Sequence, residues 1–267
     1  MQFKFSSLFI ASLALPFSAM AAQNEISAGY ADTNLYGGDI FGVQYSRYLD
    51  NIDTRSDPLQ IAPYLQRINT VRAGYANTDA FHLYSIGGDY YTGDWVFAAD
   101  LNYDKSRGYS SEVSQLVTQA GYFINDKWQA GVSLTYDHAE GRVYVPVDVN
   151  GVIQLQGVTN IGTDFTGGLY TRYTDITDGT GWDFDLAWYT DSNDLIEAGA
   201  QYFFSPQLSL ELDYTHRDLG YRNYDFAGLS VNYWFSDALA VSLGAGTDLS
   251  TGDSVTDTLT ASASWRF

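Results

Sequence analysis

The chain of 267 residues has no cysteine, only three histidines, and 13 basic residues against 32 acidic ones. Without cysteine it can form no disulfide, no thiolate metal site and no cysteine nucleophile. Because His82, His138 and His216 lie far apart in the sequence, we expect no histidine-rich metal site and no cofactor. A formal net charge of −19 disfavours contact with nucleic-acid phosphates, so we expect no nucleic acid among its partners.

Long hydrophobic runs are also missing. No apolar run reaches the ~18 residues that a membrane-spanning helix needs, which excludes a helical membrane protein. An aromatic content of 16% argues against a disordered acidic chain. Near the start, Lys4, an apolar stretch over residues 8–17 and the small-residue site at 19–21 are typical of a secretory signal peptide. We therefore expect residues 1–21 to be a signal peptide and residues 22–267 to form one exported domain.

The exported part alternates with a period of two. From Trp95 to Tyr103 and from Trp128 to Tyr136, every second residue is apolar or aromatic, and most residues between them are small or polar. Such alternation predicts a strand with one apolar and one polar face. Eight steps of ~3.3 Å, tilted by ~40°, span roughly 20 Å. Aromatic residues at both ends of such strands are typical of the girdles that bracket the apolar layer of a membrane.

Turn residues divide the chain into about 14 strands, an even number as expected for a bacterial barrel. If a weak hairpin at 68–92 is miscounted, the number is 12. We predict an all-β fold, a transmembrane antiparallel up-and-down β-barrel. Its short turns should face the periplasm and its longer loops the outside.

Two connections depart from this pattern. Residues 49–67 form a much longer periplasmic connection than the other turns, and Pro58 and Pro63 prevent a continuous strand there. Residues 139–161 contain two β-branched runs around an Asn-Gly pair at 150–151, which predicts a hairpin. As the longest outer loop, this hairpin is the expected constriction of the pore if it folds inward. The alternative is a hairpin that stands above the membrane.

The last strand carries the most specific motif. Leu259, Trp265 and Phe267 share its apolar face, and the chain ends at Phe267. This strand resembles the terminal strand of Gram-negative outer-membrane barrels, which is read by the barrel-assembly machinery. Residues 48–67 resemble the first periplasmic turn of small outer-membrane proteins of the porin type. The resemblance implies a β-barrel channel in the cell outer membrane, in contact with membrane lipid and lipopolysaccharide, with these three residues as the assembly signal. It supplies no solute.

A barrel of about 14 strands is wide enough for a lumen, and the polar parity of each strand should line it. This parity places two basic residues in the lumen, Arg72 and Arg172. The acidic residues that it places there are Asp89, Asp100, Asp104, Asp137, Asp183, Asp185, Glu197, Glu211 and Asp213. Rings of Asp and Glu favour cations. We therefore expect a monomeric channel for passive diffusion of small cationic or neutral hydrophilic solutes. The alternative is that these acids are only a hydrated inner face, some of them paired with arginine.

Two other classes of function remain. The spacing of Asp183 with Asp185, or of Glu211 with Asp213, is permissive for a glycosidase, but any polar strand face shows it. His138 and His216 cannot use their sequence neighbours as catalytic partners, because adjacent residues on a strand point to opposite faces. We therefore expect no enzyme. The alternative to an open channel is a plugged barrel with a structural or surface-adhesion role.

The inward-facing aromatic residues also allow two interpretations. They could form a track on which sugars stack, or they could simply fill a narrow barrel; the second is the simpler interpretation. These residues are Tyr91, Tyr170, Tyr189, Phe203 and Trp234.

Overall fold

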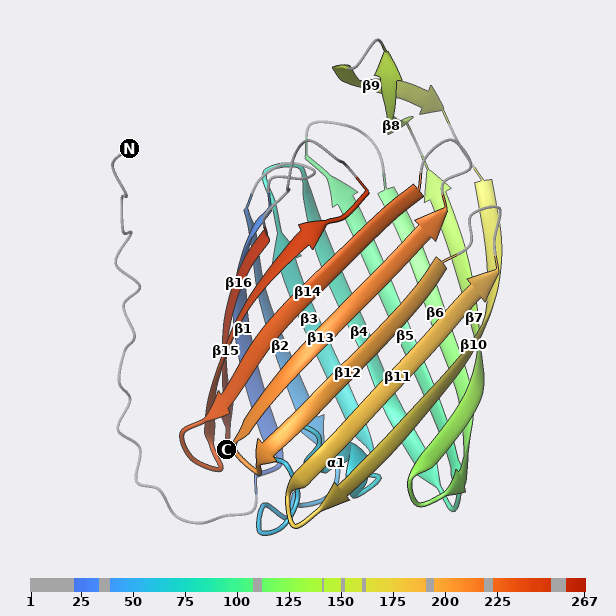
Figure 1. Ribbon diagram of the computed structural model, residues 1–267. Helices are drawn as coiled ribbons and strands as arrows, with labels where there is room; N and C mark the ends of the chain where they lie inside the picture. Colours follow the sequence, from blue (N-terminus) through green and yellow to red (C-terminus); the bar gives the residue numbers. More distant parts are fainter. Residues whose placement is uncertain are drawn as a thin grey trace, which may run out of the picture.

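The computed structural model describes residues 22–33, 39–107, 112–140, 142–149, 152–159, 162–190, 195–218, 223–250 and 258–267. The expected signal peptide lies outside these residues. Within them, 14 antiparallel strands close into a barrel, and two further strands form a separate sheet (Figure 1). In these ranges no helix is long and apolar enough to cross a membrane.

Each barrel strand pairs with its neighbours in the chain, except that β7 pairs with β10 and the first strand pairs with the last. The strands are β1 (Asn24–Thr33), β2 (Ile40–Tyr48), β3 (Thr70–Asn77), β4 (Phe81–Thr92), β5 (Trp95–Ser106), β6 (Glu112–Asn125), β7 (Trp128–Glu140), β10 (Gly162–Thr177), β11 (Thr180–Thr190), β12 (Leu195–Ser205), β13 (Leu208–Asp218), β14 (Asn223–Trp234), β15 (Leu239–Asp248) and β16 (Thr258–Arg266). The predicted barrel of 14 strands is confirmed. Closure leaves no open sheet edge, so the strands satisfy one another's backbone groups inside a membrane.

The apolar parity of the strands faces outward. Val132, Leu134 and Leu229 are about half exposed at the middle of their strands, because no other part of the protein covers them. Aromatic residues pair near the strand ends. The centres of the Trp95 and Tyr122 rings lie 5.0 Å apart, and those of the Trp182 and Tyr202 rings lie 4.7 Å apart. The outside of the barrel is therefore an apolar band with aromatic borders, as transmembrane barrels require.

Apart from residues 49–69, the connections at one end of the barrel are short, whereas those at the other end range from three residues (78–80) to nine (249–257) and longer. At one end, most turns contain only two to four residues, such as 93–94, 126–127 and 206–207. Left-handed backbone at Asp178 (φ 51°) and Gly179 (φ 74°) allows the two-residue turn between β10 and β11. Short turns mark the periplasmic end of an outer-membrane barrel.

The segment 139–161 contains the expected hairpin. Its strands β8 (Arg142–Val149) and β9 (Val152–Thr159) pair only with each other, with Val149 opposite Val152. The Asn-Gly pair itself and the side chains of this hairpin lie outside what the structure describes. The constriction expected of this segment therefore stays a prediction.

Candidate functional site

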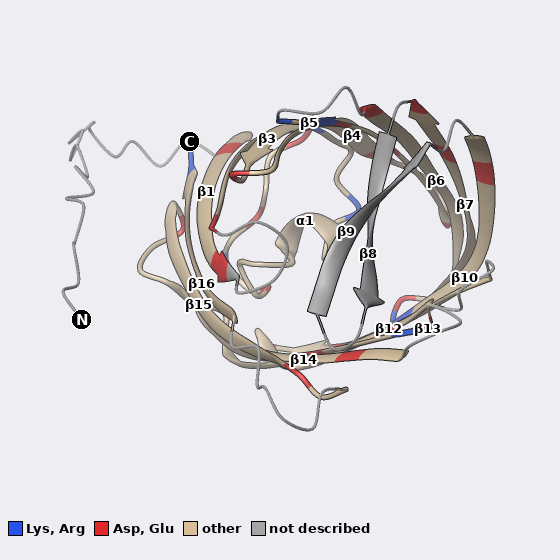
Figure 2. Cartoon of the chain, turned by 90° about the horizontal axis from the view of Figure 1, so that it is seen from above, with Lys and Arg blue, Asp and Glu red and all other residues tan. Residues whose placement is uncertain are grey.

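The connection between β2 and β3, residues 49–69, folds up into the periplasmic end of the barrel, and we call it the plug. It contains the single-turn helix α1 (Ala62–Leu65), which lies inside the ring of strands when the barrel is viewed along its axis (Figure 2). Leu59 and Ala62 are fully buried at 0% exposure, and Ile52 and Ile68 are nearly so. The connection expected from the sequence thus exists, but it occupies the lumen instead of lying below it.

One part of the plug is anchored to β12 and β13. The amide of Leu59 donates to the carbonyl oxygen of Pro206 at 2.9 Å. The Gln60 side-chain oxygen accepts from Gln201 Nε2 at 2.7 Å and from Ser209 Oγ at 2.9 Å. Gln201 and Ser209 are buried, and Gln201 Nε2 also donates to Ser209 Oγ at 2.8 Å, so Gln60 supplies the acceptor that completes this buried network.

Another part of the plug packs on a second stretch of the wall, formed by β6 and β10. The Arg172 guanidinium of β10 lies 3.6 Å from the centre of the Tyr64 ring, a cation–π contact. The same ring lies 5.9 Å from the Phe123 ring of β6, and the Arg67 guanidinium covers Phe123 at 4.1 Å. Burial raises the pKa of Tyr64, so this hydroxyl stays neutral. These contacts with β6, β10, β12 and β13 hold the plug inside the barrel, where it narrows the periplasmic end of the lumen.

The plug also presents a charged surface outward. Arg55 and Asp53 are exposed and form a bidentate ion pair, with Nη2 to Oδ2 at 2.6 Å and Nε to Oδ1 at 2.9 Å. Hydrogen bonds from Arg55 lower the pKa of Asp53 to about 2. This carboxylate is therefore charged at every pH the periplasm experiences.

Three of the predicted lumen acids are paired with arginine. Arg72 donates to both oxygens of Asp100, at 2.9 and 2.7 Å, and to Asp89 at 2.6 Å. Arg172 donates to both oxygens of Asp183, at 3.0 and 2.6 Å, and Thr174 Oγ1 adds a bond at 2.7 Å. These groups form ion pairs on the barrel wall, and because Asp89 and Asp100 share one arginine, the three acids and two arginines together keep only a single net negative charge.

Four other predicted acids form no salt bridge with any described lysine or arginine, and we call them the acidic wall. They lie on β11, β12 and β13: Asp185, Glu197, Glu211 and Asp213. Asp185 and Asp213 both stand beside Gly199 in the strand register, and the missing side chain there leaves room for the Asp185 carboxylate. Glu211 accepts from Ser230 and Asn232, at 3.3 and 3.4 Å. Negative charge is thus concentrated on one side of the lumen.

The two remaining predicted acids lie elsewhere on the inner face. Asp137 accepts from Gln115 Nε2 at 2.9 Å, and Asp104 has one buried oxygen without a hydrogen-bond partner in the described part. The sequence interpretation did not include Glu25 and Arg266, which pair inside the barrel. Glu25 and Arg266 directly neighbour Ile26 and Trp265, which lie on the outward face. Alternation along each strand therefore places both charged side chains inside, and this signal could have found them.

The plug bears on whether the inward-facing aromatic residues form a track for sugars or simply fill the barrel. Phe203 and Trp234 are almost fully buried, and Trp234 packs against Leu59 of the plug. The Tyr170 hydroxyl accepts from Gln129 Nε2 at 3.1 Å. A continuous aromatic track along the lumen would need Phe203 and Trp234 to be uncovered, but both are buried, and Trp234 packs against the plug.

The histidines lie near the outer ends of their strands. His216 Nδ1 lies 2.7 Å from Asp225 Oδ1, which also accepts from the Tyr214 hydroxyl, and His138 pairs with Glu140. Across the described ranges, no group of three or more histidine, aspartate or glutamate side chains is arranged to hold a metal ion.

Replacing Gln60 with alanine should loosen the plug. Gln201 and Ser209 would lose a buried acceptor, a cost of about 1–3 kcal/mol. Hydrogen exchange of the Leu59 amide should then accelerate by roughly 5- to 150-fold, because exchange of this amide reports local opening. Gln23→Ala is the matched control: it removes an exposed bond to Asn51 at the edge of the plug and a bond from Arg47, but no bond near Leu59, so it should leave that rate unchanged. Equal rates in both variants would show that Gln60 does not hold the plug.

Comparisons with known proteins find a porin family and an outer-membrane protein of similar structure. A family model described as "Putative general bacterial porin" matches residues 3–267. The outer membrane protein Omp33 of Acinetobacter baumannii has a similar structure, with a TM-score of 0.67 and 19% identity over 92% of this chain and 98% of that chain. The KdgM porin (TM-score 0.48, 8% identity) covers 91% of this chain and 99% of its own. The Vibrio cholerae protein OmpT lacking loop L8 (TM-score 0.48, 10% identity) covers 91% and 97%. A search of curated proteins finds no match.

Proposed function

This chain belongs to the general bacterial porin family and is an outer-membrane β-barrel, and from that premise we propose that it passes small hydrophilic solutes by diffusion, with a preference for cations. The observation that carries the proposal is the acidic wall. Asp185, Glu211 and Asp213 face the lumen without a salt bridge to a described lysine or arginine, whereas Arg72 and Arg172 are already paired. Low-dielectric walls focus the field of these carboxylates and raise the local concentration of cations.

The proposal includes a narrow point at the plug. A solute would cross the wide outer part of the lumen beside the acidic wall and then pass the gap left by residues 49–69. Small cationic or neutral solutes suit such a path. We further propose that one copy of the chain forms the channel, and that it acts as a channel and not as an enzyme.

Reversal potentials in a planar bilayer test the cation preference. The triple variant Asp185→Asn, Glu211→Gln, Asp213→Asn should move the reversal potential toward zero in a salt gradient. The wild-type preference should be clear near 0.1 M salt and weaker near 1 M, because the Debye length falls from ~10 Å to ~3 Å. Asp183 stays unchanged in this variant, since its removal would leave Arg172 unpaired.

The matched control is Asp178→Asn, an exposed carboxylate on the periplasmic turn between β10 and β11, where asparagine tolerates the same left-handed backbone. It should change the reversal potential far less than the triple variant. An anion-selective wild-type channel, or a triple variant that keeps the wild-type potential, would contradict the proposal.

A plugged barrel with a structural or surface-adhesion role is the second candidate. The observation in its favour is the burial of Leu59, Ala62, Ile52 and Ile68 in the lumen, which makes the plug a packed element. Wild-type protein that gives no conductance steps in a bilayer, while a variant without the plug does, would support this candidate.

The outward face suggests the remaining partners. Leu259 on β16 and Phe267 directly after this strand are exposed, and the Trp265 and Phe267 rings stack at 4.5 Å. We propose that membrane lipid and lipopolysaccharide contact this face in the mature barrel. The role of Leu259, Trp265 and Phe267 as the signal read by the barrel-assembly machinery stays a prediction.

A further inference from the structure

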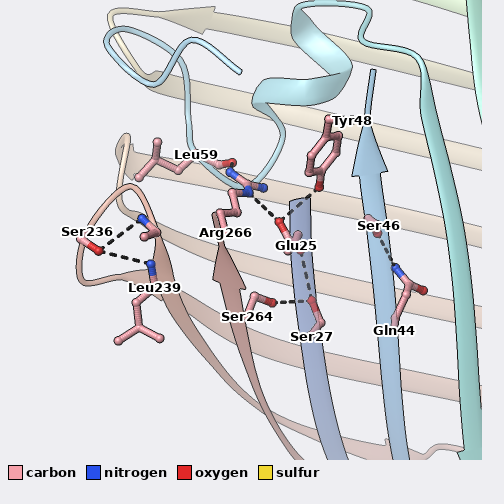
Figure 3. Close-up of polar contacts among 11 residues, drawn as sticks. Glu25, Ser27, Gln44, Ser46, Tyr48, Leu59, Ser236, Leu239, Ser264 and Arg266 are labelled. Carbon is pink, nitrogen blue, oxygen red and sulfur yellow. Dashed lines mark hydrogen bonds and ion pairs between the residues drawn. The ribbon is translucent and has the colours of Figure 1, made fainter. Parts of the chain in front are cut away.

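Arg266 stands where the last strand, the first strand and the plug meet (Figure 3). Its side chain is only 2% exposed. Nε donates to Glu25 Oε2 of β1 at 2.5 Å, and Nη1 donates to the Leu59 carbonyl oxygen of the plug at 2.6 Å. The guanidinium also lies 4.1 Å from the centre of the Trp234 ring. One side chain thus connects three segments that are far apart in the sequence.

Glu25 orients this guanidinium. It is the residue directly opposite Arg266 in the pairing of β1 with β16, so the two charges come together only when the barrel closes. Oε2 of Glu25 also accepts from the Tyr48 hydroxyl at 3.2 Å, and Oε1 accepts from Ser27 Oγ at 3.1 Å. These bonds fix the orientation of the Glu25 carboxylate, so it holds the Arg266 guanidinium in one position. A buried arginine needs such a partner to offset its loss of water.

The plug supplies the second acceptor for Arg266, the carbonyl oxygen of Leu59. With Nε turned toward Glu25, the planar guanidinium presents Nη1 to the Leu59 carbonyl group. A lysine could pair with Glu25, but its single ammonium group lacks the rigid fork that holds two acceptors in separate directions. The geometry therefore requires arginine for both contacts at once.

We propose that Arg266 couples closure of the barrel to docking of the plug. Pairing of β16 with β1 brings Glu25 to Arg266, and the oriented guanidinium then holds the plug at Leu59. Glu25 and Arg266 are positioning residues for the constriction, and they act before any solute enters. The proposal rests on the proposed function only in that the plug narrows the channel.

Barrels refolded in detergent allow the test without the assembly machinery. Arg266→Met and Arg266→Lys should both accelerate exchange of the Leu59 amide, by roughly tenfold or more for the loss of a bond from a charged donor. Single-channel conductance should rise in the same variants. The matched control is Arg47→Ala, which removes an arginine bonded to Asn24 and Gln23 at the same end of the barrel. It should change neither measurement.

The charge swap Glu25→Arg with Arg266→Glu separates the two contacts. It restores an ion pair across the closure, so the temperature at which the barrel unfolds in detergent should recover toward wild type. It also places a carboxylate against the Leu59 carbonyl oxygen, so fast Leu59 exchange and high conductance should remain.

Two results would overturn the proposal. One is slow, wild-type Leu59 exchange in Arg266→Met and Arg266→Lys, because the plug would then dock without this arginine. The other is recovery of slow exchange in the charge swap, which would mean that barrel stability alone holds the plug. Leu59 exchange does not depend on conduction, so these results stand even if the plug proves not to limit the current.

Discussion

Removing the plug should raise single-channel conductance several-fold. Residues 50–68 can be replaced by Asn-Gly, because Tyr48 and Thr70 are paired and Leu49 already bonds to Asn69, which suits a two-residue hairpin turn. The change empties the periplasmic end of the lumen of Leu59, Ala62 and Ile68, which are buried there. Conductance in a planar bilayer measures the result.

Two further variants show which segment limits the current. Arg55→Ala alters only an exposed side chain of the plug, 87% accessible, and should leave conductance unchanged. Deletion of residues 143–158 removes most of the outer hairpin. A rise in conductance on hairpin deletion, with none on plug deletion, would place the constriction at the outer end and refute the role assigned to the plug.

Placing arginine on the outward face should strongly destabilise the barrel in a membrane. Leu229 is 45% exposed at the middle of β14, where its side chain faces lipid. Leu229→Arg should cost about 2–4 kcal/mol, the penalty for arginine at the midplane of a barrel wall. Denaturant titration of the protein folded into lipid vesicles measures this free energy of folding.

The neighbouring residue provides the matched control. Ser230 faces the lumen, with its hydroxyl 3.3 Å from Glu211 Oε2, so Ser230→Arg would place its charge beside a carboxylate. It should cost much less than Leu229→Arg. Equal costs at the two positions would contradict the assignment of the two faces.

The alternation of the sequence determined the barrel and the direction of its side chains. A strand has only two faces, and water and lipid select opposite residues, so Trp95 to Tyr103 alone predicts which side chains face the membrane. Turn residues between such strands were enough to predict 14 of them. The same parity predicted an inward direction for Asp100, Asp185 and Glu211.

Parity could not predict which lumen charges pair. Arg72 reaches Asp100 because the register places both beside Gly87, and a register depends on backbone pairing between strands. Asp185 lies beside Asp213 across a glycine for the same reason. The sequence therefore predicted an acidic lumen, and only the tertiary structure decided which acids stay without an arginine.

The plug was decided by tertiary structure alone. Its buried contacts join residues far apart in the chain, such as Gln60 with Gln201 and Leu59 with Arg266. The only local signal was a long connection with more apolar residues than a hydrated turn needs, among them Leu59, Ile61 and Ile68. Such residues show that a segment must be buried somewhere, but the closed barrel supplies the surface that buries them. The sequence thus determined the wall of this channel, and the closure of that wall determined what fills it.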